Sequence, residues 1–247
     1  MADILPEVLG TVGALYRYPV KSMRGEAITE AQVTYRGVPG DRRYAFVLDG
    51  NLAAFPYLTG RQVPAMVRYS AWLADESDPA HPTVLVRTPE GETLPVASEA
   101  LRADLARRYA KPFHLLRLGL VGTYDIALLS LITSGTVRAL SAALGMPLEA
   151  RRFRPTIYVQ TPEGRPFPED AWVGHTLVFG DDAVRMRATE RDLRCKMINI
   201  DPETAALEPR VLREVVRTRQ EGAGIYGTPE KQGLLRVGMP VRLLAGD

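Results

Sequence analysis

Residues 9–20 read LGTVGALYRYPV, a short run of β-forming residues that is interrupted by Gly10 and Gly13 and closed by Pro19. Runs of this kind, separated by Gly, Pro or Asp-Gly turns, are typical of strands. They recur about every ten residues, which favours a barrel or sandwich over alternating strands and helices. The other runs of the first half are AITEAQVTYRGV (27–38), RRYAFVLDG (42–50), MVRYSAWLAD (66–75) and TVLVRTPEG (83–91).

Three helices are predicted among the strands. Ser98 can cap the first, the second ends at Gly145 before Pro147, and the third begins near Pro209. We therefore predict a mainly β protein with a few helices (α+β), made of two packed β-rich domains over residues 1–115 and 116–247. The strands expected in the second half are PTIYVQT (155–161), HTLVFGD (175–181), AVRMRATE (183–190), CKMINI (195–200) and MPVRLL (239–244).

Composition narrows the class of protein. The 247 residues carry 31 basic and 29 acidic side chains, a net charge of +2, so the sequence does not indicate a nucleic-acid partner. The first residues, MADILPEVLG, show no positively charged region before an apolar core, so we expect no secretory or transit peptide. No apolar run approaches the roughly 18 residues of a membrane span. We expect a soluble, cytoplasmic protein that needs no membrane.

Cys195 is the only cysteine, and it lies in the run ERDLRCKMINID (190–201). A single thiol excludes an internal disulfide and an all-cysteine metal site. We expect it at the start of a strand, after a polar connection, where Arg191, Arg194 and Lys196 would favour the thiolate. Three interpretations remain: a buried hydrophobe, a reactive thiol, or one ligand of a metal that something else also holds. Local features alone favour an inert core thiol, because free cysteines are among the most buried residues.

Two other uses of the thiol find little support. A cysteine nucleophile of the protease kind needs a histidine base, and the candidates are His81, His114 and His175. The first lies in a turn, and the other two flank apolar runs, where a packed histidine is the usual case. The spacing also shows no set of Cys and His ligands for zinc.

Basic turns provide a possible anion site. Lys21, Ser22 and Arg24 follow a predicted strand and offer an ammonium, a hydroxyl and a guanidinium, which suit a phosphate. A solvated basic turn is the alternative. Because neighbouring residues of a strand face opposite sides, not every basic residue of these turns can reach one pocket. Further basic turns contain Arg42 and Arg43, Arg61 beside Gln62, and Arg154.

Taken in order, six stretches resemble the molybdenum cofactor sulfurase C-terminal (MOSC) family, in particular the branch of the mitochondrial amidoxime-reducing component and its bacterial relatives. The resemblance spans nearly the whole chain and implies a MOSC-type β-barrel packed on an amino-terminal β-rich domain. The stretches are YPVKSMRG (18–25), GDRRYAFV (40–47), TGRQVPAM (59–66), FRPTIYV (153–159), RCKMINIDPET (194–204) and VGMPVRLL (237–244).

The resemblance also implies a cofactor and its ligands. In this branch one pterin dithiolene and one protein cysteine hold molybdenum, and Cys195 stands at the position of that cysteine, as metal ligand and catalytic residue. The pterin phosphate would be bound by Lys21, Ser22 and Arg42, with Arg154 reaching the cofactor from the second half. Thr156 and Arg194 complete the expected cofactor-binding set.

Some positions depart from the family pattern. Thr156 offers a hydroxyl where relatives often carry an amide, Leu193 replaces a frequent serine, and Met23 replaces the cysteine of a KSC triplet. These changes affect fine contacts with the cofactor and the range of substrates.

The resemblance implies an oxidoreductase that reduces N-hydroxylated compounds such as amidoximes, hydroxylamines and N-hydroxylated bases. Since the chain has no flavin or iron–sulfur motif, electrons would come from a separate protein. One alternative is a carrier of persulfide sulfur or of the molybdenum cofactor without reductase activity, and another is a degenerate binding module that holds no metal. The chain is too short to hold a desulfurase as well, so we expect no pyridoxal phosphate. Asp201 is interpreted as a turn cap.

Overall fold

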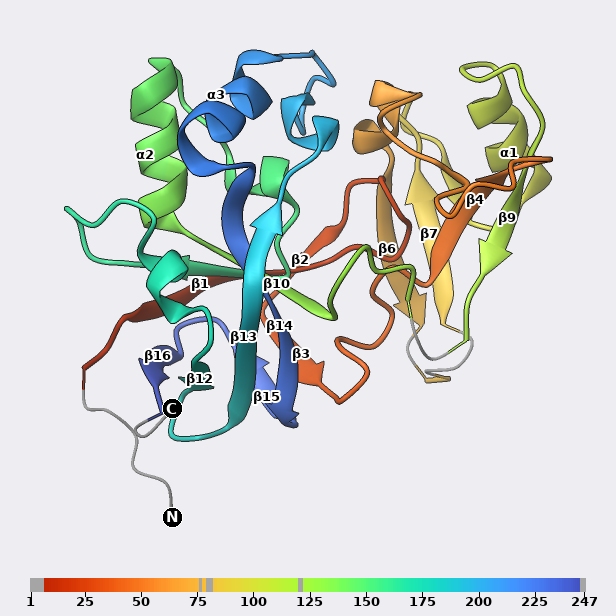
Figure 1. The fold of residues 1–247 in the computed structure, drawn as a ribbon. Coiled ribbons are helices and arrows are strands. Elements are labelled where there is room, and N and C mark those ends of the chain that lie inside the picture. Colours follow the sequence, from red (N-terminus) through yellow and green to blue (C-terminus); the bar gives the residue numbers. More distant parts are fainter. Residues whose placement is uncertain (1–6, 76, 79–81, 120–121, 245–247) are drawn as a thin grey trace.

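A seven-stranded β-barrel and a second β-rich lobe beside it make up the computed structural model, which describes residues 7–75, 77–78, 82–119 and 122–244 (Figure 1). The strands follow the order β11, β10, β14, β13, β12, β16, β1, and pairing of β1 with β11 closes the barrel, while β2 extends the sheet from β1. This architecture confirms the predicted mainly β class. The bounds are β1 (Gly10–Arg17), β2 (Glu26–Ile28), β10 (Leu129–Thr133), β11 (Ile157–Gln160), β12 (Thr176–Phe179), β13 (Val184–Leu193), β14 (Gly222–Lys231) and β16 (Pro240–Leu243).

The opening stretch both closes the barrel and leaves it. Thr11 faces Gln160 of β11 on one side of β1 and Pro240 of β16 on the other. Gly10 makes this approach possible, since a Cβ there would lie 2.3 Å from the Gln160 carbonyl oxygen. Beyond β1 the chain passes into the second lobe, where Val20 forms a parallel bridge with Tyr44. The segment that follows β1 therefore lies at the junction of the two parts.

The second lobe holds two three-stranded sheets around its own core, and a separate pair of strands lies near the barrel. Because β1 and β2 pair within the barrel sheet, residues 10–17 and 26–28 contribute to the same sheet as the second half of the chain. The domain boundary at residue 115 stays a prediction. The strands are β4 (Tyr44–Leu48), β5 (Tyr57–Leu58) and β9 (Phe113–Arg117); β6 (Ser70–Asp75), β7 (Thr83–Arg87) and β8 (Thr93–Pro95); and the pair β3 (Glu30–Val33) and β15 (Gly233–Arg236).

The three predicted helices form as α1 (Glu99–Ala106), α2 (Ser134–Leu144) and α3 (Arg210–Arg219). Ser98 caps α1 by accepting a hydrogen bond from the Leu101 amide, and Gly145 ends α2 in the left-handed conformation. Pro209 is the cap residue of α3, as its position predicted. On α3, Val211 and Val215 are buried, whereas Val216 is 45% exposed.

Short 3-10 helices complete the described part: η1 (Pro64–Arg68), η2 (Ala150–Phe153), η3 (Pro168–Trp172) and η4 (Lys196–Asn199). Both α2 and α3 pack on the outside of the barrel over a shared apolar cluster that includes Ile198 of η4. The helices therefore fix the segment that follows Cys195.

The strand predicted over residues 195–200 is wrong, and so is the polar connection before it. β13 runs on to Leu193 and stays paired with β14 despite register shifts near residues 188–193, so these polar residues belong to the strand. Residues 196–199 form η4, because the apolar side chain of Ile198 packs under α3 rather than in the sheet. Cys195 is the cap residue of this turn, just past the end of β13.

We predict that Ile225→Ala destabilises the protein by about 2–5 kcal/mol, because this fully buried side chain of β14 fills the barrel core. The lower midpoint of urea or thermal unfolding measures the loss. Val216→Ala removes a half-exposed side chain from α3 and is the control, with an expected change of about 0.5 kcal/mol or less. Equal effects of the two substitutions would contradict the described core.

Candidate functional site

A cavity of about 280 Å³ opens at the junction of barrel and second lobe. Its lining comes from the turn after β1, the loop before β4, the loop before β10, the segment around η2, and the end of β13 with η4. The structure thus brings together residues that are far apart in the sequence. All of the predicted site residues line this cavity: Lys21, Ser22, Arg42, Arg154, Thr156, Arg194 and Cys195.

Lys21 reaches the cavity from the bridge segment after β1. Its Nζ donates to the Thr123 carbonyl oxygen at 2.9 Å and pairs with the carboxylate of Asp125. The ammonium also lies 5.1 Å from the ring centroids of Phe55 and Tyr57. Burial lowers the pKa of Lys21, and Asp125 opposes this effect. A phosphate bound here would compete with the half-exposed Asp125 carboxylate for the ammonium.

Arg42 lies over the ring of Tyr18, 5.0 Å from its centroid. Its guanidinium pairs with the fully buried Asp41 and donates to the Arg154 carbonyl oxygen at 3.1 Å. Burial alone would lower the pKa of Arg42, but the Asp41 carboxylate raises it above its usual range. Arg43 turns the other way and donates to the Leu118 carbonyl oxygen, which confirms that adjacent arginines of this run cannot share one pocket.

Arg154 lies over the same aromatic ring, 4.4 Å from the Tyr18 centroid. Its guanidinium donates to the Met23 carbonyl oxygen at 2.8 Å. Burial, together with a smaller effect of the neighbouring Arg42, lowers the pKa of Arg154 to about 10. The side chain remains charged at neutral pH, so two guanidinium groups contact one buried tyrosine.

Backbone strain is concentrated at this cavity. Ser22, Arg42 and Arg154 have φ values of 67°, 51° and 53°, in the left-handed region. Eight non-glycine residues of the described chain have a positive φ, and these three line the cavity. Such conformations cost of order 1–3 kcal/mol each and persist where the surroundings hold them, often at functional sites.

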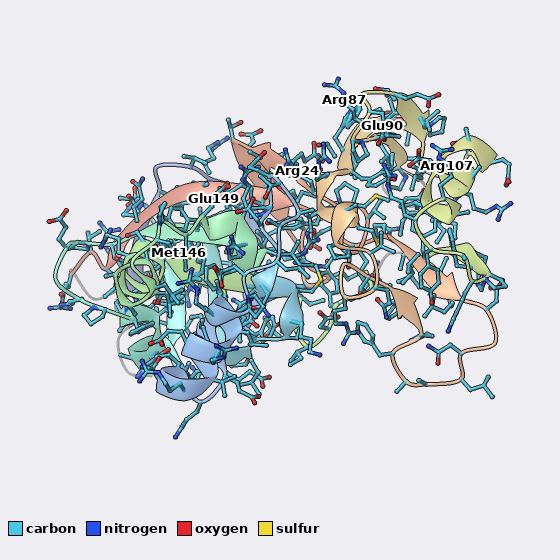
Figure 2. All side chains as sticks on the ribbon, turned by 90° about the horizontal axis from the view of Figure 1, so that it is seen from above. Arg24, Arg87, Glu90, Arg107, Met146 and Glu149 are labelled. Atoms are coloured by element: carbon cyan, nitrogen blue, oxygen red, sulfur yellow. The ribbon has the colours of Figure 1, made fainter. Side chains whose placement is uncertain are left out.

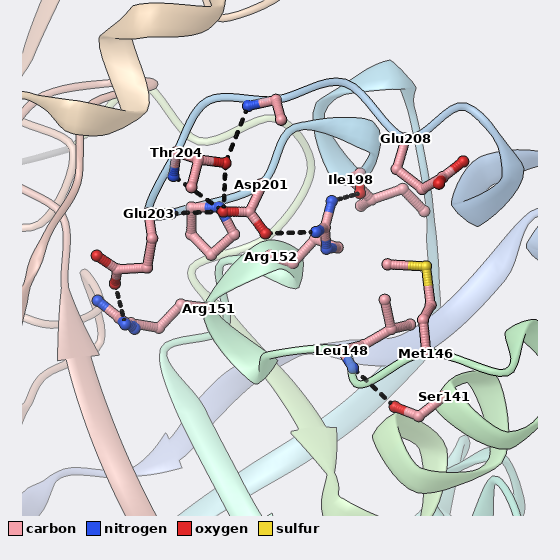
Figure 3. A network of polar contacts seen from close by, with 12 residues as sticks. Ser141, Met146, Leu148, Arg151, Arg152, Ile198, Asp201, Glu203, Thr204 and Glu208 are labelled. Carbon is pink, nitrogen blue, oxygen red and sulfur yellow. Dashed lines mark hydrogen bonds and ion pairs between the residues drawn. The ribbon is translucent and has the colours of Figure 1, made fainter.

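Cys195 is exposed and lines the cavity, so the interpretation as an inert core thiol is wrong. After η4, the turn over residues 201–204 is held by Asp201, whose Oδ1 accepts from the Thr204 amide at 2.9 Å and the Glu203 amide at 3.1 Å (Figure 3). These bonds confirm Asp201 as a turn cap. Burial would raise the pKa of Asp201, but the hydrogen bonds of this turn and the nearby Arg152 lower it.

The loop that contains Pro202 and Glu203, which follows Cys195 and η4, is bonded to the segment after β1. Arg24 donates to the Pro202 carbonyl oxygen at 2.6 Å and pairs with Glu203 at 2.9 Å. Figure 2 shows Arg24 between the two parts of the molecule. Arg24 does not line the cavity. Of the basic turn formed by Lys21, Ser22 and Arg24, only Lys21 and Ser22 face the cavity.

Thr156 and Arg194 reach the cavity from the barrel side. The buried Thr156 Oγ1 has no hydrogen-bond partner among the described residues. Arg194 donates to the carbonyl oxygens of Ala223 at 2.6 Å and Phe153 at 2.8 Å. Its guanidinium also lies over the Phe153 ring, 5.5 Å from the ring centroid. Leu193, at the cavity mouth, is 52% exposed.

Sequence reasoning missed several residues of this cavity, above all Asp192, Asp125 and Tyr226. Asp192 stands three positions before the cysteine among arginines, a local signal that could have drawn notice. Tyr226 comes to the site because β14 pairs with β13, and no local pattern shows that pairing. Asp125 lies in the loop before β10, where the sequence indicates only a connection.

The structure gives no support to a thiol–histidine pair or a protein-only metal centre. His114 lies beside Asp49 and His175 follows η3, and neither lines the cavity, while His81 lies outside the described residues. Among the residues that the structure describes, no three His, Cys, Asp or Glu side chains gather to hold a metal. None of the described helices is long and apolar enough to cross a membrane.

These features define a class: a mainly β protein whose barrel and second lobe enclose a cationic cavity with one exposed thiol. The chain belongs to the MOSC family. The model of the MOSC N-terminal beta barrel domain matches residues 9–115, and that of the MOSC domain matches residues 123–242.

Individual relatives are distant. The mitochondrial amidoxime reducing component 2 of Rattus norvegicus is 25% identical over 94% of this chain and 83% of its own length. The protein of the same name from Bos taurus is 24% identical with the same coverage. Among solved structures, the YUAD protein from Bacillus subtilis has a TM-score of 0.50 at 13% identity and covers 95% of this chain and 94% of that one, which supports the fold alone.

We predict that Asp125→Asn strengthens the binding of inorganic phosphate about fivefold at low salt, because the carboxylate that pairs with Lys21 is removed. Isothermal titration calorimetry measures the affinity. Asp182→Asn is the matched control, since Asp182 also pairs with a lysine, Lys231, but does not line the cavity. Unchanged or weaker phosphate binding by Asp125→Asn would count against this cavity as an anion site.

Proposed function

We propose that this protein is a molybdenum-cofactor-dependent reductase of N-hydroxylated compounds. The observation that carries the proposal is that the exposed thiol of Cys195 lines the same cavity as Lys21, Arg42 and Arg154. The MOSC family is associated with molybdenum cofactor binding, and the two named relatives are amidoxime reducing components.

The residues present fit the cofactor. Cys195 would supply the one protein sulfur ligand, and a soft thiolate suits such a metal. Arg42 and Arg154 would fork onto oxygens of the pterin phosphate, whereas Lys21 would add a point charge. Ser22, Thr156 and Arg194 would add polar contacts.

Two observations of this cavity support an anionic, polar ligand. The buried Thr156 hydroxyl has no partner among the described residues, and such a group is costly unless something hydrogen-bonds to it. Burial lowers the pKa of Lys21, and the nearby charges of Arg42 and Arg154 lower it as well, so the charged form of Lys21 is disfavoured beside these two cations. A bound phosphate would relieve both costs.

When bound, the molybdenum centre supplies the two-electron chemistry that breaks the N–O bond. The electrons would come from a separate redox protein. Among the described residues, the cavity mouth carries Phe55, Ile126 and Leu193, which are 37%, 53% and 52% exposed. We expect this apolar edge to favour substrates whose N-hydroxyl group is attached to an apolar body such as a phenyl ring. A cytoplasmic location stays a prediction.

We predict that purified wild-type protein carries about one molybdenum and one pterin per chain, because each chain offers one cysteine ligand. The Cys195→Ala variant should lose the metal. Elemental analysis and pterin fluorescence measure the content. The wild-type protein should reduce benzamidoxime to benzamidine with an artificial electron donor, and the variant should not.

Arg61→Ala is the control, because Arg61 lines the same cavity but is exposed and stacks on Phe55, 4.5 Å from the ring centroid, outside the proposed cofactor contacts. It should keep its molybdenum. A wild-type protein that holds labile sulfane sulfur on Cys195 and no metal would instead support the persulfide carrier.

A further inference from the structure

Asp192 is a carboxylate held at the cavity wall without a role in the proposed cofactor contacts. Its side chain is 3% exposed, yet it lines the cavity together with Cys195. On β13 neighbouring side chains face opposite sides, so Leu193 lies exposed at the mouth while Asp192 faces inward. A buried carboxylate that borders a reaction cavity is available to a bound substrate.

The surroundings of Asp192 hold it in one place. The Arg194 Nη2 lies 2.8 Å from the Asp192 Oδ2, a contact of charges without the alignment of a hydrogen bond. Two backbone carbonyl oxygens fix the rest of that guanidinium, as described above. From the adjacent strand β14, the Tyr226 hydroxyl hydrogen-bonds to the carboxyl group.

The charge environment favours proton exchange near neutral pH. Burial, with a smaller effect of Asp125, raises the pKa of Asp192 to about 6, against the opposing effects of Arg194, the Tyr226 hydroxyl and Arg42. These charged and titratable groups act on the carboxyl group from the neighbouring elements. Burial and Asp192 also raise the pKa of Tyr226, so the phenol stays protonated and can keep donating. An acid tuned to this range is suited to general acid catalysis.

We propose that Asp192 is the proton donor of this cavity and protonates the oxygen that leaves the N-hydroxylated substrate. This role rests on the proposed function. The overall reaction is R–NH–OH + 2 e⁻ + 2 H⁺ → R–NH₂ + H₂O. The N–O bond breaks, the substrate nitrogen is reduced by two electrons from the separate redox protein, and the oxygen leaves as water. Asp192 gives one proton to that oxygen, and solvent supplies the second proton and restores the acid.

The pH dependence follows from the direction of the shift. Below about pH 6 Asp192 carries its proton and can donate it; above that pH the donor form is lost. We therefore expect kcat/KM to fall about tenfold per pH unit above this point. Asn keeps the shape of the Asp192 side chain but carries no acidic proton. Asp192→Asn should therefore lower kcat on the order of 100-fold and abolish the fall of kcat/KM above about pH 6.

Tyr226→Phe is the second variant, and it keeps the acid in place. Removal of a hydrogen bond that lowers the pKa of Asp192 should move the fall of kcat/KM to higher pH. A purely structural role of Asp192 predicts no such movement. The Tyr226→Phe result therefore decides the proposal even where Asp192→Asn fails to fold or to bind the cofactor.

A titration of the cofactor-free protein provides a readout besides activity. With ¹³C-labelled aspartate, the carboxyl signal that disappears in Asp192→Asn should titrate near pH 6, and its midpoint should rise in Tyr226→Phe. Asp201 is the internal reference, since its pKa is lowered and its signal should titrate well below that point. A midpoint of Asp192 in the usual range of carboxylates would overturn the proposal.

Failure of this role and failure of the proposed function are distinguishable. A wild-type protein that reduces benzamidoxime, together with variants whose rate and pH profile match it, overturns the role of Asp192 alone. A cofactor-loaded wild-type protein that reduces no N-hydroxylated compound overturns the proposed function and this role with it.

Discussion

The cavity depends on one buried carboxylate. Asp41 is fully buried, accepts a hydrogen bond from the Tyr18 amide at 2.7 Å and pairs with the guanidinium of Arg42. Tyr18 belongs to the segment that leaves the barrel, and Arg42 to the loop before β4 of the second lobe. Because a buried carboxylate is costly unless its oxygens are satisfied, Asp41 holds these two segments together. The ring of Tyr18 then becomes the surface on which Arg42 and Arg154 meet.

The cations of the cavity are neutralised to different degrees. Lys21 pairs with Asp125, Arg42 with Asp41, and Arg194 with Asp192. Arg154 forms no ion pair with the described residues and relies on the Met23 carbonyl oxygen and the Tyr18 ring. Burial, with a smaller effect of the neighbouring Arg42, lowers the pKa of Arg154. An anionic group that enters the cavity would therefore gain most beside Arg154, and would have to displace a carboxylate beside Lys21.

The sequence allowed the strand-rich class, the helix caps and the separation of Arg42 from Arg43 to be predicted, because these depend on local periodicity and turn chemistry. It did not predict β13 through residue 193, because pairing with β14 keeps polar residues in a strand that a local pattern ends earlier. It also did not predict η4, since MINI alternates like a strand and only the packing of Ile198 under α3 decides otherwise. The exposure of Cys195 was likewise decided by tertiary structure. Asp192 and Tyr226 meet only through the barrel register.

Guanidinium–carbonyl bonds join the segments that make the cavity. Arg42 donates to the carbonyl oxygen of Arg154, and Arg154 donates to that of Met23, beside Lys21 and Ser22. Arg194, next to Cys195, donates to the carbonyl oxygen of Phe153, one residue before Arg154. The same arginines thus carry positive charge into the cavity and fix the backbone of the neighbouring segment. A lysine could supply the charge but not the planar, multiply donating group, so placement of the thiol and placement of the cations are one structural requirement.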